Sequence, residues 1–137
     1  VAAARGWIGT PYHHQASCRG AGCDCIGLVR GVWREMLGPE PERMPAYTPD
    51  WAEARGRETL LEGAARHFLP VALDAVQPGD ILLFRWKSGT PAKHVGISAG
   101  PTFIHAYDSA GAVVEGALSA VWKRKLAAAF SFPGVID

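Results

Sequence analysis

The sequence predicts an α+β fold in which N-terminal helices pack on an antiparallel β-sheet. In residues 26–37, apolar side chains recur with the spacing of one helical face. After residue 78 the apolar residues instead form short runs separated by proline, glycine and polar residues, a pattern typical of strands. The chain has 137 residues, enough for one hydrophobic core, so residues 1–137 are expected to form a single domain.

The first predicted element is a short helix over residues 1–7, which ends at a Gly-Thr-Pro break. A polar loop over residues 12–22 follows it. Asp24 is a good helix N-cap, and Gly38 begins a Gly-Pro pair of the kind that ends helices. A helix is therefore predicted over residues 25–37.

Residues 39–50 contain four prolines and cannot be helical throughout. Asp50 can cap a second helix over residues 51–68, because apolar side chains there share one face. A Leu-Pro pair ends that helix, and five strands are predicted beyond it. Their ranges are 80–84, 94–98, 102–106, 112–115 and 129–132.

Composition and charge argue against several classes of function. Hydrophobic residues make up 48% of the chain and charged residues 20%, as in ordinary globular proteins, and the formal net charge is +1. A nucleic-acid-binding protein usually carries a basic face, whereas this chain has only the basic triplet 123–125, so no nucleic-acid partner is expected. No apolar run reaches membrane-spanning length, and the first residues lack the layout of a secretory signal. Neither a membrane partner nor a signal peptide is therefore expected in residues 1–137.

Three cysteines, Cys18, Cys23 and Cys25, lie within eight residues, which raises the question of a metal site. Zinc ligands usually come as two pairs along the chain, and no second pair follows here. No metal and no cofactor is therefore expected, and a zinc-binding adaptor is an alternative. A disulfide between Cys18 and Cys23 is sterically conceivable and would leave Cys25 as the free thiol, but the sequence leaves that pairing open.

Cys25 stands in the first turn of the predicted helix. There the unpaired backbone N–H groups and the positive end of the helix dipole favour a thiolate over a thiol. The sequence thus places a cysteine where a nucleophile is useful. A buried structural cysteine at a helix start would satisfy the same pattern.

Two histidines belong to a predicted β-hairpin. With Ala99 and Gly100 as a two-residue turn, His94 and His105 are directly opposite each other and point to the same face of the sheet. Two such imidazoles suit a general base and the group that orients it. Cys25 packed against that face would complete a Cys–His–His site. The alternative is a pair of histidines satisfied by hydrogen bonds at a sheet edge.

Five short motifs, which together span most of the chain, form a recognisable set. They are GTPY at 9–12, DCIGLV at 24–29, QPGDILLF at 77–84, HVGI at 94–97 and IHA at 104–106. Taken together, the motifs resemble those of the NlpC family of cell-wall cysteine peptidases, whose fold is papain-like. Within the family the chain looks most like the phage-tail and gene-transfer-agent branch, because of YHHQ at 12–15 and DCIGLVRGVW at 24–33.

The resemblance implies hydrolysis of a peptide bond in bacterial peptidoglycan stems, after γ-D-glutamate and before a diamino acid. Cys25 would be the nucleophile, His94 the general base and His105 the residue that orients the base. Tyr12 matches a tyrosine that lines the site near the nucleophile in the family, and Asp24 is assigned with it to the substrate- and oxyanion-binding side. The backbone N–H of Cys25 would help to hold the oxyanion.

The resemblance also implies where the protein acts. The expected partners are peptidoglycan stem peptides and the proteins of a phage tail or gene-transfer agent, and the expected location is such a particle or the cell envelope. Two other functions could use the same fold: acyl transfer or amide hydrolysis by a Cys–His pair, and a structural tail-tip subunit with an idle site. The intact Cys25, His94 and His105 argue against an idle site.

The chain departs from the family pattern in three places. The stretch His13-His14-Gln15 replaces the glycine-rich segment that often follows the tyrosine in the family. Ile26 stands where a serine commonly follows the nucleophile, and residues 39–70 form a long insertion between the cysteine and the first histidine. Apolar side chains and arginines in the insertion would suit one wall of a cleft for stem peptides, which carry carboxylates. Alternatively, they dock the helix on the core and face water. The residues concerned are Met44, Tyr47, Trp51, Arg55, Arg57, Arg66 and Phe68.

Overall fold

The structure is a computed structural model that describes residues 1–41 and 59–133. In chain order the elements are α1 (Ala2–Arg5), β1 (Ser17–Cys18), β2 (Gly22–Cys23), α2 (Cys25–Leu37), α4 (Thr59–His67), β3 (Leu69–Val71), η1 (Leu73–Ala75), β4 (Ile81–Phe84), β5 (His94–Ser98), β6 (Thr102–Tyr107), η2 (Asp108–Ala110), β7 (Ala112–Ala117), α5 (Ala120–Lys125) and β8 (Leu126–Ser131). Helices α2 and α4 precede the strands of an antiparallel sheet, which confirms the predicted α+β class.

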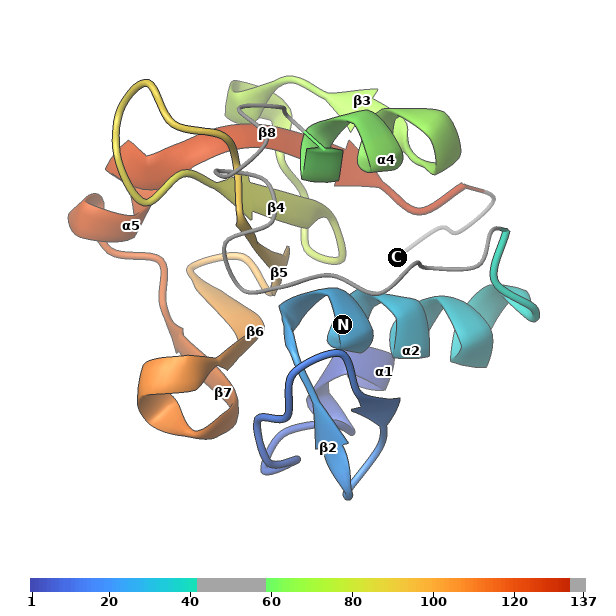
Figure 1. Ribbon diagram of the computed structural model, residues 1–137. Coiled ribbons are helices and arrows are strands. Elements are labelled where there is room, and N and C mark those ends of the chain that lie inside the picture. The colour runs from blue at the N-terminus through green and yellow to red at the C-terminus, as the bar shows by residue number, and fades with distance from the viewer. Residues whose placement is uncertain (42–58, 134–137) are drawn as a thin grey trace.

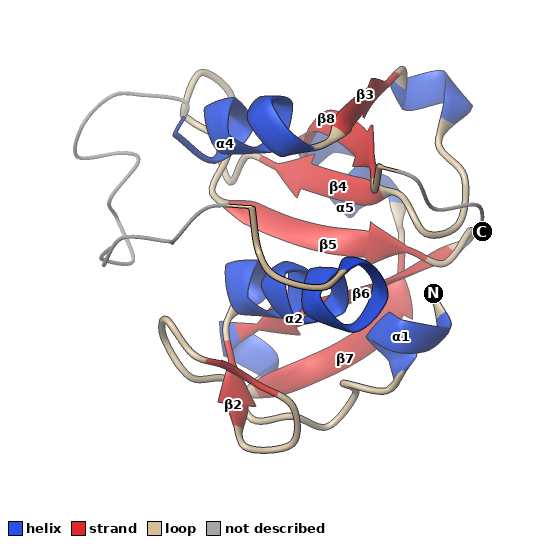
Figure 2. Cartoon of the chain, turned by 90° about the vertical axis from the view of Figure 1, so that its right-hand side faces the viewer, coloured by secondary structure: helices blue, strands red, loops and turns tan. Residues whose placement is uncertain are grey.

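The centre of the molecule is a six-stranded antiparallel sheet with the strand order β3-β8-β4-β5-β6-β7 (Figure 1). Figure 2 shows α2 and α4 in front of this sheet and α5 behind it. Because side chains alternate between the faces of a strand, the sheet supports two apolar clusters. The cluster under α2 and α4 includes Leu28, Val32, Ala64, Leu83, Val95, Ile97 and Ile104, and the cluster on the far face contains Leu82, Phe84, Phe103 and Ala129 with Trp122 of α5 packed on it.

Helix α2 begins and ends where the sequence predicts. Oδ1 of Asp24 accepts a hydrogen bond from the N–H of Gly27 (2.8 Å), which is the geometry of an N-cap. Gly38 ends the helix with a φ of 92°, a conformation that glycine adopts without strain. The buried side of α2 packs on β5 and β6, so the sheet fixes the position of the helix start.

Gly31 lets Trp7 pack closely on α2. Trp7 is only 2% exposed, and a Cβ added to Gly31 would overlap its six-membered ring. We expect Gly31→Ala to lower the free energy of unfolding by about 1–3 kcal/mol, because overpacked cores must shift side chains or backbone. Urea denaturation followed by circular dichroism measures this loss.

Gly63 of α4 provides the matched control. A Cβ there would meet nothing closer than the Arg66 side chain at 3.6 Å. Gly63→Ala should therefore leave the free energy of unfolding unchanged or raise it, since alanine has the higher helix propensity. Equal losses of stability in the two variants would contradict the packing explanation for Gly31.

The second predicted helix is confirmed where the structure describes it, from Thr59 to His67. Phe68 at its end packs edge-on against Trp33 of α2 (5.2 Å between ring centroids) and against Phe132 (5.3 Å). Phe68 therefore docks the helix on the core, and Arg66 is exposed. The other insertion residues, Met44, Tyr47, Trp51, Arg55 and Arg57, lie outside the described residues.

The strands follow the prediction in four cases, and several further elements were not predicted. The last strand begins at Leu126 rather than 129, because the chain turns from α5 directly into β8. It lies between β3 and β4, so it joins segments that are far apart in sequence. The short edge strand β3, the helix α5 and the β1–β2 ribbon in the predicted loop were not expected.

Among the described residues, no helix combines the length and apolar character that a membrane span needs.

The hairpin of β5 and β6 turns one residue later than predicted. The N–H of Ala99 donates to the carbonyl of Thr102 (2.8 Å), so Gly100 and Pro101 form the turn. The pairing is shifted by two residues, and the prediction that the two histidines lie directly opposite each other is wrong. A shift of two keeps every side chain on its own face, so the prediction that both imidazoles share a face is confirmed.

Candidate active site

The thiol of Cys25 lies beside the first residue of β5. Its Sγ is 4.0 Å from the carbonyl oxygen of Lys93, and the backbone N–H of Val95 donates to it. These two backbone groups flank His94 in the chain, so the first turn of α2 meets β5 where the strand begins. Cys25 is 9% exposed and is the first residue of the helix, as predicted.

Helix α2 does not cover the sheet face that the sequence analysis expected. It packs on the face of Val95 and Ile97, whereas the ring of His94 lies on the opposite face against Phe84 (5.8 Å between centroids). The expectation that Cys25 packs on the face bearing His94 is therefore wrong. The thiol instead contacts the backbone at the start of β5, on both sides of His94.

His94 and His105 form a buried pair. Nε2 of His94 and Nδ1 of His105 are 2.7 Å apart, and the residues are 4% and 3% exposed. Extending the pairing of Ile97 with Ile104 places Gly96 across from His105, so His94 reaches its partner on the diagonal. A Cβ on Gly96 would lie 3.2 Å from Cβ of His105, so glycine leaves the space in which the two rings meet.

The hydrogen bond fixes which nitrogen of His94 can act as a base. Nε2 of His94 is engaged with His105, which leaves Nδ1 to take a proton. For Nδ1 to be free of a proton, Nε2–H must donate and Nδ1 of His105 must accept. His105 must then be neutral and carry its proton on Nε2.

Burial supports neutral imidazoles. Burial, and then the neighbouring His105, lower the pKa of His94 from 6.5 to about 3. Burial lowers the pKa of His105 to about 4. Both rings are therefore uncharged near neutral pH, as a base and its hydrogen-bond acceptor need to be.

The thiol is also held in its neutral form, contrary to the expectation that the helix start favours a thiolate. Burial raises the pKa of Cys25 to about 12, and the charge of Asp24 acts in the same direction. The backbone N–H of Val95 opposes this rise but does not reverse it. The resting site thus contains a neutral thiol and a neutral imidazole, so attack by sulfur requires that a base remove its proton.

Tyr12 is half-buried beside the start of α2. Its N–H donates to the carbonyl of Gly111 (2.8 Å), and its backbone forms a bridge with Cys23, which holds Tyr12 next to the junction between β2 and α2. Burial, followed by the charge that Cys25 carries when ionised, raises the pKa of the Tyr12 hydroxyl. The hydroxyl therefore stays protonated and able to donate a hydrogen bond near the thiol.

Asp24 shapes the loop over the helix start. While Oδ1 caps α2, Oδ2 accepts a hydrogen bond from the N–H of Gln15 (2.7 Å), and Asp24 is 2% exposed. Gln15 has a φ of 65°, a left-handed conformation that is unusual for a residue other than glycine. Asp24 thus ties the loop to α2. Its assignment to the substrate- and oxyanion-binding side remains a prediction.

The other cysteines do not join the site. All three are free thiols; Cys18 is exposed on β1 and Cys23 is buried, so the disulfide left open by the sequence is not formed. Within residues 1–41 and 59–133, no group of three or more His, Cys, Asp or Glu side chains is arranged to hold a metal ion.

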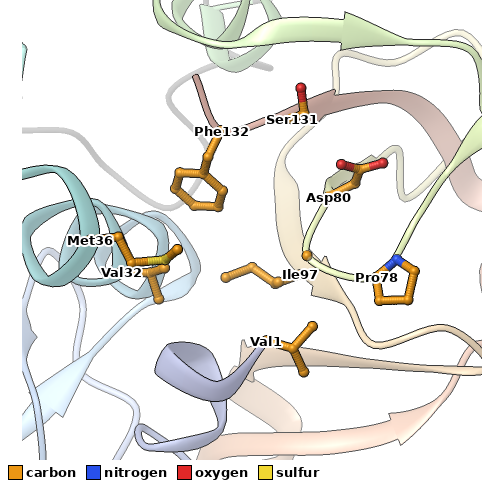
Figure 3. Close-up of a pocket in the computed structure, with 9 residues that line it drawn as sticks. Val1, Val32, Met36, Pro78, Asp80, Ile97, Ser131 and Phe132 are labelled. Carbon is orange, nitrogen blue, oxygen red and sulfur yellow. The ribbon is translucent and has the colours of Figure 1, made fainter. Parts of the chain in front are cut away.

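A pocket lies at the far end of α2. It opens between α2, the N-terminus and the turn before β4, as Figure 3 shows. Val32 and Met36 line it from the second half of the helix, and Asp80 lines it from the turn before β4. Because Cys25 and the two histidines are not among its lining residues, this pocket is separate from the candidate site.

Three aromatic residues around the histidine pair were missed by the sequence analysis. Trp86 stacks on His94 (5.0 Å, 28° between planes), and Tyr107 stacks on His105 (5.1 Å, 23°). Trp122 meets His105 edge-on at 5.2 Å. No motif marks them, because they come from three separate segments of the chain. The mid-strand glycine at 96 was the one local signal of a close approach.

The neutral histidines set the expected pH dependence. For a reaction that uses His94 as its base, we expect kcat/KM to stay level from about pH 8 to about pH 5, because protonation of His94 or His105 would remove that base only below the ordinary histidine range. A pH–rate profile measured with a defined peptide substrate tests this. A half-maximal rate near 6.5, the ordinary histidine value, would contradict neutral burial of the pair.

Stability must be followed in the same experiment. The unfolded chain binds protons at its histidines below their ordinary pKa of about 6.5, whereas the buried pair does not until the pH is lower. The free energy of unfolding therefore falls as the pH drops below that value. Circular dichroism at each pH separates loss of the base from loss of the fold.

The comparisons with known proteins point to one family. A family model described as "NlpC/P60 family" matches residues 9–131. A curated relative from Escherichia coli K12, "Murein DD-endopeptidase MepS/Murein LD-carboxypeptidase", is 28% identical over 120 residues, which are 87% of this chain and 54% of that protein. "Gamma-DL-glutamyl hydrolase" of Bacillus subtilis is 32% identical over 130 residues, which are 92% of this chain and 27% of that protein.

The fold has matching solved structures. The NlpC/p60 domain of the peptidoglycan hydrolase SagA superposes with a TM-score of 0.64 at 24% identity, over 96% of this chain and 94% of that domain. This likeness establishes the fold. The chain spans about half the length of the first curated relative and about a quarter of the second.

Proposed function

The chain belongs to the NlpC/P60 family, and on that premise we propose that it is a cysteine endopeptidase that cleaves peptidoglycan stem peptides after γ-D-glutamate and before a diamino acid. The observation that carries the proposal is the arrangement around His94. Its ring is hydrogen-bonded to His105, and its two backbone neighbours contact the thiol of Cys25. A thiol, a base and a group that orients the base are the parts that acyl transfer needs.

Acylation begins with proton transfer from the neutral thiol. Sγ of Cys25 gives its proton to Nδ1 of His94 and attacks the γ-carbonyl carbon of the glutamyl residue, and the carbonyl π electrons move to oxygen. The backbone N–H of Cys25 and the Tyr12 hydroxyl are the donors assigned to that oxyanion. The oxyanion then collapses, the C–N bond breaks, and the amine of the diamino acid leaves with the proton from His94. The product on the enzyme is a thioester.

Deacylation repeats the steps with water. Nδ1 of His94 takes a proton from a water molecule whose oxygen attacks the thioester carbon. Collapse of the second oxyanion breaks the C–S bond, and the sulfur regains its proton from His94. Throughout, Nδ1 of the neutral His105 accepts the hydrogen bond from Nε2–H of His94, which holds His94 in the tautomer whose Nδ1 carries no proton. The reaction requires Nδ1 of His94 to come within hydrogen-bonding distance of Sγ at the start of β5.

Two observations favour a γ-glutamyl bond. The motifs around Cys25 and His94 resemble those of a family that cuts this bond, and one relative is named as a γ-DL-glutamyl hydrolase. The other relative is named as a murein DD-endopeptidase and LD-carboxypeptidase, so the family contains more than one bond specificity. The bond must therefore be read from products.

Digestion of purified peptidoglycan tests the proposal. Sacculi incubated with the protein should release fragments whose masses correspond to cleavage between γ-glutamate and the diamino acid. The Cys25→Ser variant should release none. Release of fragments cut at another bond would overturn the specificity. No release, or transfer of the acyl group to an added amine in place of water, would overturn hydrolysis and favour an idle site or an acyltransferase.

We further propose that the protein acts as part of a phage tail or gene-transfer-agent particle, where it opens the wall during penetration. The support is the resemblance of residues 12–15 and 24–33 to that branch of the family. Particles purified from the source cells should contain the protein by mass spectrometry and should digest peptidoglycan. Its recovery in the cell envelope fraction and its absence from particles would contradict this placement.

A further inference from the structure

The imidazoles of His94 and His105 lie under a layer of partly exposed aromatic rings. The two histidines are 4% and 3% exposed, whereas Trp86, Tyr107 and Trp122 are each partly exposed. The layer therefore stands between the hydrogen bond and solvent. Its members come from the segment after β4, the end of β6 and α5.

Each histidine has its own stacking partner. Trp86 lies on His94 with centroids 5.0 Å apart and planes inclined by 28°, and Tyr107 lies on His105 at 5.1 Å and 23°. On its other side His105 stacks on Phe103 (4.1 Å, 28°), so it is held between two rings. Stacking at these distances restrains the plane of an imidazole as well as covering it.

Trp122 joins the two halves of the layer. Its ring meets Trp86 at 5.8 Å, Tyr107 at 5.5 Å and His105 at 5.2 Å, the last two edge-on. It is also packed on Phe84 and Phe103 of the far-face cluster. The helix α5 thus anchors the layer to the sheet.

We propose that Trp86, Tyr107 and Trp122 are positioning residues that fix the planes of the two imidazoles and exclude water from the hydrogen bond between them. The proposal deepens the proposed function, because the bond it protects is the one that orients the general base. Trp86 contacts His94, and Tyr107 and Trp122 contact His105, so they act through the histidines. Without them, water would compete for Nε2 of His94 and the ring could rotate.

Charge on the surrounding elements offers a competing explanation for uncharged histidines. Lys125 contacts the layer directly: its Nζ donates to the carbonyl of Trp86 (3.0 Å) and lies 5.7 Å from the centre of the Trp86 ring. A nearby ammonium would also disfavour protonation of His94. The charged or titratable groups on the elements packed against the pair are Cys25 of α2, Arg85 after β4, Lys93 before β5, Tyr107 of β6, Asp108 of η2, and Lys123, Arg124 and Lys125 of α5.

An NMR titration of the imidazole signals separates the two explanations. In Trp86→Ala the pKa of His94, and in Tyr107→Ala that of His105, should rise by about one unit or more toward the ordinary histidine value. Tyr107→Phe keeps the ring and should leave the titration unchanged. Lys125→Met removes the charge and keeps the rings, so it too should leave the titration unchanged.

Trp33→Ala is the matched control for loss of a large ring. Trp33 packs on Phe68 and Phe132 on the other side of the sheet, so its loss lowers stability without uncovering the histidines. If Trp33→Ala moves the histidine titrations as far as Trp86→Ala does, general loosening explains the effect and the proposal fails. A rise of the pKa in Lys125→Met, with none in Trp86→Ala and Tyr107→Ala, would assign the effect to charge and would also overturn it.

The NMR titration of the histidines can be measured whether or not the protein hydrolyses stem peptides. Where the wild-type protein hydrolyses stem peptides, the acid limb of kcat/KM should move upward in Trp86→Ala by the same amount as the histidine titration. Where it hydrolyses nothing, the proposed function fails, while the titrations still decide whether the ring layer keeps the pair dry. Either alanine variant carries the test alone if the other does not fold.

Discussion

Cys25→Ala is expected to reduce hydrolysis of stem peptides to the uncatalysed background, a loss of roughly three orders of magnitude or more. In the proposed mechanism this side chain supplies the sulfur atom that bonds to the glutamyl carbon. Because Cys25 is almost fully buried, its loss also removes core contacts, so the fold is verified by circular dichroism. Initial rates with a defined peptide and with sacculi measure the effect.

Cys18→Ser and Cys23→Ala are the controls for thiol chemistry. Cys18 is exposed on β1 and Cys23 is fully buried on β2, so the first change should be silent and the second should affect stability more than rate. If a folded Cys18 or Cys23 variant loses hydrolysis as completely as Cys25→Ala does, Cys25 is not the sole nucleophile.

His94→Ala is expected to cost about as much as loss of the thiol, because nucleophile and base act as one unit and their effects do not add. The neutral Cys25 thiol, whose pKa burial raises to about 12, makes this dependence stronger, since no thiolate exists at neutral pH without a base. The double variant Cys25→Ala, His94→Ala should be no slower than either single variant. Rates of purified, folded variants test this.

Replacements of His105 should be graded. His105 uses Nδ1, the nitrogen nearer the backbone, to bond with His94 at 2.7 Å. Asparagine places its amide oxygen close to that position, whereas glutamine extends beyond it. His105→Asn should therefore retain more activity than His105→Gln, and His105→Ala should retain least. Equal rates for all three variants would contradict an orienting role.

The shared face of the two histidines could be predicted because the strand period is robust. Placing the turn one residue early shifts the pairing by two, and a shift of two leaves each side chain on its face. The prediction of direct opposition failed because Ala99 could be read as part of the turn, whereas it pairs with Thr102. Composition around a turn locates it to within one residue but does not fix the register.

Other features depend on contacts between distant segments. The order β3-β8-β4 brings residues 69–71 and 126–131 beside 81–84, and no local pattern specifies that pairing. The stacking of Trp86 on His94 exists only because β4 and β5 pair and α5 returns across the far face. The charge state of Cys25 likewise follows from burial, which outweighs the local effect of the helix start. These features could be read only from the folded chain.

The most direct test of the account is to trap the acyl-enzyme. A defined stem peptide mixed with the protein and quenched in acid at early times should give an intact mass increased by the γ-glutamyl fragment minus water, and peptide mapping should place the adduct on Cys25. The adduct should be absent from Cys25→Ser and should form more slowly in His94→Ala. Hydrolysis of the peptide with an unchanged protein mass at every time point, or an adduct on a residue other than Cys25, would contradict nucleophilic catalysis by this thiol.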